Sequence, residues 1–121
     1  MKELLAEWQK RLGLTDWRIK VQWKCAPDEM ALHGGSGCTE WSEAVKAASI
    51  QICDEKYYGD RVVSFDAEKT LVHELLHLKL ALVSSEVSDL QERYMHQIID
   101  DLARAFIDAK RSGQTESVGE A

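Results

Sequence analysis

The chain has 121 residues, a length that suits one domain and is too short for a two-lobed protease with a deep cleft. Its formal net charge is −6 and its basic residues are scattered, which argues against nucleic acid or an anionic membrane as the main partner. Because no apolar run reaches the length of a membrane span and the N-terminus lacks an apolar signal core, we expect a cytoplasmic protein. Cys25, Cys38 and Cys53 are odd in number and lack CxxC spacing, so we expect free thiols.

The first predicted element is an amphipathic helix from Lys2 to Leu12. Leu4, Leu5, Trp8 and Leu12 fall on one stripe, opposite charged residues, which is typical of a helix that packs on a core. Gly13 follows as the expected stop.

Strands are predicted next. In Trp17 to Lys24, apolar and polar residues alternate, as they do in a strand with one buried face. After a break at Pro27, Met30 to Gly37 is expected to form a glycine-rich loop. Cys38 to Trp41 and Ala47 to Cys53 then predict a hairpin, with Ala48, Ile50 and Ile52 on one face of its second strand.

A buried helix follows a polar loop over 54–63. Ser64 or Asp66 is the expected N-cap, and the segment from Thr70 to Val83 is apolar almost all round, which predicts a helix buried on several sides. Within it, residues 73–77 spell HELLH, an HExxH motif.

The motif is a spacing argument about metal binding. Positions i and i+4 lie on one face of a helix, so His73 and His77 can present two imidazoles to one ion. Glu74 lies about 100° round the helix from His73, within reach of a water on that ion. A third ligand must come from elsewhere. The longer metzincin pattern is excluded because its glycine and third histidine would fall at Leu80 and Val83.

The last predicted element is a helix over roughly 89–110. Its expected apolar face consists of Met95, Ile98, Ile99, Leu102, Ala105, Phe106 and Ala109. Glu92, His96 and Asp100 form a polar stripe beside that face at spacing i, i+4, i+8. Residues 112–121 lack periodicity and are expected to form a disordered tail.

The residues around VHELLHL resemble those of the zincin metallopeptidases, and the short chain is similar to minimal, single-domain gluzincin-like and phage-type metallopeptidases. The resemblance covers roughly Trp17 to Ile107, and only HELLH is specific. It implies a zincin-like α+β domain over residues 1–111, with an N-terminal helix, a small, mostly antiparallel sheet of about three strands, the motif helix and a C-terminal helix that bears a ligand. It also implies that the 38–53 hairpin forms the upper rim of the cleft, where an open edge could add a peptide strand.

The resemblance further implies Zn²⁺ bound by His73 and His77, a third ligand on the following helix, and an acidic residue four positions later that contacts the first motif histidine. On this chain the pair is either Glu92 with His96 or His96 with Asp100. We favour His96 as third ligand with Asp100 behind it, because a carboxylate commonly fixes the tautomer of a ligand histidine, and we keep Glu92 as the alternative.

The function expected from this reading is a zinc-dependent metallopeptidase that cleaves a peptide or protein substrate through a zinc-bound water activated by Glu74. The alternative is a catalytically silent zincin-fold module that binds or regulates a partner and keeps a structural or vestigial zinc site. A group that stabilises the oxyanion is also required, and the candidates are Tyr57, Tyr58, His33, Arg93 and Tyr94.

Overall fold

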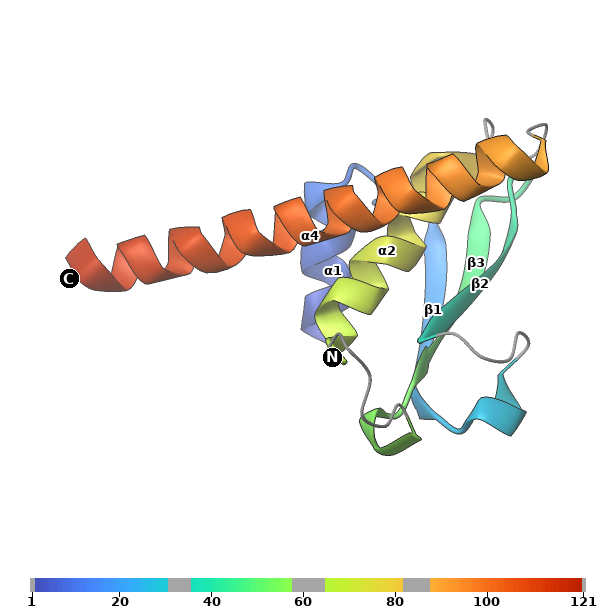
Figure 1. The fold of residues 1–121 in the computed structure, drawn as a ribbon, viewed down its shortest axis with the longest axis horizontal. Coiled ribbons are helices and arrows are strands. Elements are labelled where there is room, and N and C mark those ends of the chain that lie inside the picture. Colours follow the sequence, from blue (N-terminus) through green and yellow to red (C-terminus); the bar gives the residue numbers. More distant parts are fainter. Residues whose placement is uncertain (1, 31–35, 58–64, 82–87, 121) are drawn as a thin grey trace.

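A computed structural model describes residues 2–30, 36–57, 65–81 and 88–120, with the backbone alone for Pro27 and for 114–120. The elements in chain order are α1 (Lys2–Arg11), β1 (Arg18–Cys25), the short 3-10 helix η1 (Pro27–Glu29), β2 (Gly37–Ser42), β3 (Ala47–Cys53), the short 3-10 helix η2 (Glu55–Tyr57), α2 (Ala67–Lys79) and α4 (Asp89–Glu120). The helices gather on one side of the small sheet (Figure 1). The predicted small α+β domain is therefore what the described residues form.

The sheet has three strands in the order β1-β3-β2. The strands β2 and β3 pair antiparallel, as a hairpin should, whereas β1 and β3 pair parallel. The expectation of a mostly antiparallel sheet was wrong in this respect. The strand β2 does not pair with β1, and β3 lies between the two and pairs with both. As a result β2 is an edge strand.

One face of β3 supplies the core and the other a smaller cluster. Ile50 and Ile52 are fully buried beneath the helices, as the alternation predicted. The main core also contains, as buried residues, Trp8, Leu14, Leu71, Val72, Leu75, Leu76, Leu78, Ile99, Ala103 and Ile107. On the opposite face Cys53 packs with Cys25, Cys38 and Met30, and all three cysteines are buried and free, which confirms their prediction as thiols.

The predicted end of α1 and the predicted start of α2 are confirmed. Gly13 follows α1 with a φ of 70°, a left-handed conformation that glycine adopts without strain. At the start of α2, Asp66 is the N-cap, and its carboxylate accepts a hydrogen bond of 3.1 Å from the Lys69 amide. The alternative cap, Ser64, lies outside the described residues. The helix ends at Lys79, short of the expected Val83.

The buried face of α4 differs from the expected one. Ile99, Ala103 and Ile107 are the buried residues, at successive i+4 positions, whereas Ile98 and Phe106 are exposed. The predicted face included Ile99 but left out Ala103 and Ile107. Among the described elements, α4 packs mainly on α2, so one narrow row of α4 residues is buried.

The helix α4 also continues beyond Lys110, where it was expected to end, to Glu120. Residues 112–120 are thus helical rather than without regular structure. The segment contains no proline, and Gly113 costs a helix only about 1 kcal/mol, so nothing in the sequence stops propagation. These last turns project beyond the body of the domain (Figure 1). Within the described ranges, no helix is long and apolar enough to cross a membrane.

Candidate metal centre

The first two imidazoles of the site lie one above the other on α2. The ring centroids of His73 and His77 are 5.1 Å apart. Most of the helix around them is buried against the sheet, α1 and α4, so the backbone that carries both rings is held on several sides. This is the rigid pair that the i, i+4 spacing predicted.

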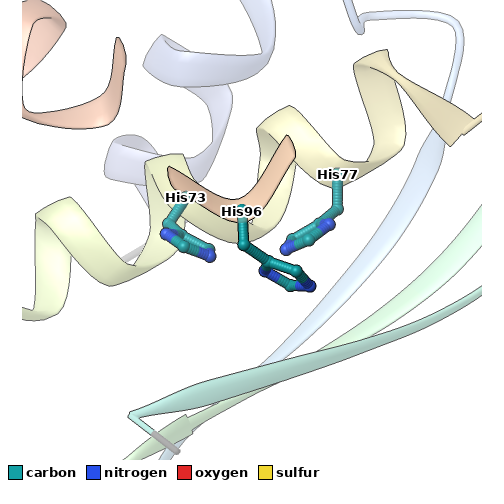
Figure 2. Close-up of side chains that lie close together, drawn as sticks. All are labelled: His73, His77 and His96. Atoms are coloured by element: carbon teal, nitrogen blue, oxygen red, sulfur yellow. The ribbon is translucent and has the colours of Figure 1, made fainter. Parts of the chain in front are cut away.

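The third imidazole comes from α4. His96 lies 4.7 Å from His77 and 6.1 Å from His73 between ring centroids, and the three rings point into the same space (Figure 2). Each of the three histidines offers a ring nitrogen such that all three atoms lie within 4.8 Å of one another. His96 precedes the buried Ile99 by three residues, so the packing of α4 on α2 turns its side chain toward the motif helix.

Asp100 stands behind His73 rather than behind His96. Its carboxylate lies 3.6 Å from Nδ1 of His73, 3.3 Å from Nζ of Lys69 and 3.0 Å from a guanidinium nitrogen of Arg104. The helices α2 and α4 run antiparallel, so a residue one turn later on α4 faces a residue one turn earlier on α2. Asp100 therefore faces the first motif histidine, and this contact leaves Nε2 of His73 for a metal.

Glu92, the alternative third ligand, lies at the border of the same space. It lines the same cavity as the histidines, and its carboxylate is 3.9 Å from Nε2 of His96. Among the described residues, it does not belong to the group whose ligand atoms all lie within 4.8 Å. The geometry thus brings His96, and not Glu92, to the motif pair.

Glu74 is the buried carboxyl of the site. It is 6% exposed, and Oε1 accepts a hydrogen bond of 2.7 Å from the Thr39 hydroxyl on β2. Burial raises the pKa of Glu74 to about 7, and the Thr39 hydrogen bond offsets only part of that effect. A carboxyl with such a pKa can both accept and donate a proton near neutral pH.

The pKa values of the motif histidines move the opposite way. Burial, with the neighbouring His73 and His96, lowers the pKa of His77 to about 4. Burial also lowers the pKa of His73, although Asp100 opposes the shift. Both rings are therefore neutral at pH 7, the form in which an imidazole donates its lone pair to a metal.

Gly37 allows β2 to lie directly on the motif helix. A Cβ atom at this position would stand 2.8 Å from Cγ2 of Thr70 and 3.3 Å from Cγ of Glu74. Any side chain here would push the strand off the helix. The strand that carries Thr39 is thus held against Glu74 by the absence of a side chain two residues earlier.

A cavity of about 400 Å³ opens over the histidines. Its described lining comes from β2 (Gly37, Cys38, Thr39, Trp41), α2 (His73, Glu74, His77) and α4 (Glu92, Met95, His96). Of the proposed oxyanion candidates, Tyr57, Arg93 and Tyr94 do not line it, while His33 and Tyr58 lie outside the described residues.

Thr39, Trp41 and Met95 were not singled out as site residues by the sequence analysis. The alternation in β2 places Thr39 and Trp41 on the same face as Gly37, but no local pattern says which helix that face meets.

No protein-family model matches the chain, and no match was found among curated proteins or solved structures. The zincin resemblance therefore rests on the residues around VHELLHL alone.

Proposed function

We propose that this protein is a zinc-dependent metallopeptidase. One observation carries the proposal: three imidazoles from two helices converge beside a buried carboxyl, in a cavity bordered by the open edge of a sheet. Two surface histidines at i, i+4 would account for the motif alone. They would not account for a third imidazole with a ring nitrogen within 4.8 Å of theirs, or for a glutamate that is 6% exposed.

The donor set suits zinc. Zn²⁺ accepts three neutral imidazoles and, in catalytic sites, keeps a fourth position open. His73, His77 and His96 would hold the ion, and Asp100 would fix the ring orientation of His73. A zinc ion in this position would supply a Lewis acid that makes water more acidic and polarises a carbonyl group.

Glu74 would be the general base. It neighbours His73 in the chain and lines the cavity with the three rings. Its carboxylate would take a proton from the attacking water, and the resulting acid would return the proton to the leaving amine. Thr39 holds Oε1 of Glu74 and so fixes the direction of the carboxylate.

The edge of β2 would bind the substrate backbone. The amide of Cys53 donates a hydrogen bond of 2.8 Å to the carbonyl of Ser36. In an antiparallel pair, every second residue directs its backbone groups to the partner strand. Counting from Ser36, Cys38 and Glu40 therefore direct their backbone groups toward β3. The backbone groups of Thr39 and Trp41 are then directed to the open edge. A peptide that added there as an extra strand would pass over the histidines.

The test combines metal analysis with cleavage of an unstructured protein such as casein. We expect about one zinc per chain and measurable cleavage, and we expect Glu74→Gln to lose at least about 100-fold in rate while it keeps its zinc. Glu40→Gln is the matched control, because Glu40 lies on β2 but lines a cavity on the opposite face of the sheet. A wild-type protein without zinc, or equal rates in wild type and Glu74→Gln, would refute the proposal.

A catalytically silent module with a structural or vestigial zinc site is the second candidate. One observation favours it: none of the described oxyanion candidates lines the cavity. This function predicts one zinc per chain, no cleavage of any peptide, and a large loss of thermal stability on chelation. Zinc without turnover, together with unfolding in chelator, would decide for it.

A further inference from the structure

A stripe of large apolar side chains lies on the outside of α4. Its five residues recur every four positions and are all exposed: Leu90 (59%), Tyr94 (58%), Ile98 (55%), Leu102 (37%) and Phe106 (38%). We refer to these five residues as the α4 stripe. Single exposed apolar residues are common on protein surfaces, but a continuous row along one helix marks a site of interaction.

Neither the core nor the candidate metal centre uses this stripe. The core takes Ile99, Ala103 and Ile107, and the metal centre takes His96, which lies about 160° round the helix from Ile98. The stripe runs beside the buried row of α4, about 100° round the helix from it, and none of its residues lines the cavity. Along its length α4 crosses the outside of the body and then extends beyond it (Figure 1).

We infer that the α4 stripe is the interface of a homodimer, in which α4 of one copy packs antiparallel on α4 of the other. The order of side chains supports a second copy as the partner. The four residues Tyr94, Ile98, Leu102 and Phe106 read aromatic, aliphatic, aliphatic, aromatic from either end. Under a two-fold axis between Ile98 and Leu102, Tyr94 of one copy meets Phe106 of the other, and Ile98 meets Leu102.

The area is suitable for such a dimer. From their sizes and exposed fractions, the five side chains present roughly 400–500 Å² of surface. A stable interface buries about 800 Å² on each partner, of which somewhat more than half is apolar. The stripe supplies that apolar part. Ala105, which is also exposed, is small enough to let two helices approach closely there.

The charges beside the stripe also permit self-association. Arg93, Asp101, Arg104 and Asp108 are exposed along one side of it, two of each sign. This border is therefore electrically balanced, although the whole chain carries −6. Two copies can approach along α4 without the repulsion that their net charge would cause at an acidic surface.

Sedimentation equilibrium of the full chain tests this inference, over about 1 to 100 µM, a range that brackets the Kd of a modest dimer. We expect wild type to change from monomer to dimer with concentration. Ile98→Arg, at the middle of the stripe, should raise Kd at least about 100-fold, because it places two charges in the interface. Gln97→Arg is the matched control, with the same added charge at the neighbouring exposed position off the stripe, and it should leave Kd within about threefold.

Two outcomes would overturn the inference. One is a wild type that stays monomeric over the whole range, and the other is a dimer that Ile98→Arg leaves intact. Since Ile98 is more than half exposed, the substitution should not disturb the fold, and circular dichroism of both variants verifies this. If Ile98→Arg nevertheless unfolds, Tyr94→Glu on the same stripe replaces it in the same measurement.

Discussion

The two ends of the contact between α2 and α4 are both polar, and they are built in opposite ways. Near the start of α2, Glu68 accepts hydrogen bonds from Lys110 and from the Trp8 indole, and Asp66 receives both terminal guanidinium nitrogens of Arg111. Every charged group there has a partner of opposite sign. Two turns along α2, the same pair of helices presents three imidazoles and Glu74.

The difference is visible in the direction of the pKa shifts. At the first end, burial raises the pKa of Glu68, but Lys110 and Trp8 lower it by more, so the carboxylate stays ionised. At the second end, burial moves Glu74 and His77 toward their neutral forms, and few partners oppose it. Paired ions hold the helices together, whereas neutral bases with unused lone pairs are what a metal or a proton transfer requires.

The largest expected effect comes from breaking the paired end. In Lys110→Met, Glu68 loses the closer and more buried of its two cations and keeps only Arg111, at 3.4 Å. We expect a loss of about 3 kcal/mol in the free energy of unfolding, measured by urea denaturation. Arg104→Met is the control on the same helix: the Arg104 side chain is 59% exposed while that of Lys110 is 8% exposed. It should cost less than about 0.5 kcal/mol. Equal losses in the two variants would contradict the contrast between the ends.

The next effect concerns metal affinity. Asp100→Asn removes the negative charge beside His73, and we expect zinc affinity to fall about 10- to 100-fold in competition with a chelating dye, because such a carboxylate orients a ligand ring and raises its basicity. Asp101→Asn changes the neighbouring exposed carboxylate and should leave the affinity unchanged. If both variants bound zinc as wild type does, Asp100 would be only a surface ion-pair partner.

The remaining effect is a gain rather than a loss of stability, and it occurs at the candidate site. In the metal-free protein the pKa of Glu74 is about 7, above its ordinary value of 4.5, so the folded state binds more protons than the unfolded state between these values. Stability from this group is complete below pH 4.5 and is lost as pH rises through 7. Gln cannot ionise and can still accept the Thr39 hydrogen bond. Glu74→Gln should therefore be more stable than wild type at pH 8, by up to about 3 kcal/mol.

Thermal unfolding of the metal-free protein at pH 5 and pH 8 measures this gain. The advantage of Glu74→Gln should fall below about 1 kcal/mol at pH 5, where folded wild-type Glu74 is largely protonated. Glu40→Gln, on the far face of β2, should behave like wild type at both pH values. A pH-independent difference between Glu74→Gln and wild type would show that the carboxyl is not held in its neutral form.

Local patterns predicted the local structure. The apolar stripe of α1, the Asp66 cap and the alternation in β3 each depend on residues a few positions apart, and all three are present. The convergence of His96 on the motif pair was also anticipated. The binding of zinc, the hydrolysis of peptides and the zincin fold stay predictions.

Features that depend on how separate elements meet were not predicted. The parallel pairing of β1 with β3 is decided by which strand enters the sheet between the others. The contact of Asp100 with His73 follows from the antiparallel course of α4 along α2, and the residue pattern alone did not give it, because only the zincin resemblance implied such a contact. The Thr39 contact with Glu74 joins residues 35 positions apart. For α4, the sequence shows apolar residues on much of the circumference, and only the packing selects the stripe of Ile99, Ala103 and Ile107.

The origin of the third imidazole has a consequence for the maturation of the chain. His73 and His77 share one helix and come together as soon as that helix forms, but His96 joins them only when the last helix docks. A newly synthesised or partly unfolded copy would hold zinc through two side chains and lose it easily. For the metallopeptidase proposed above, hydrolysis would require this docked helix, so a copy with α4 undocked could not degrade its neighbours.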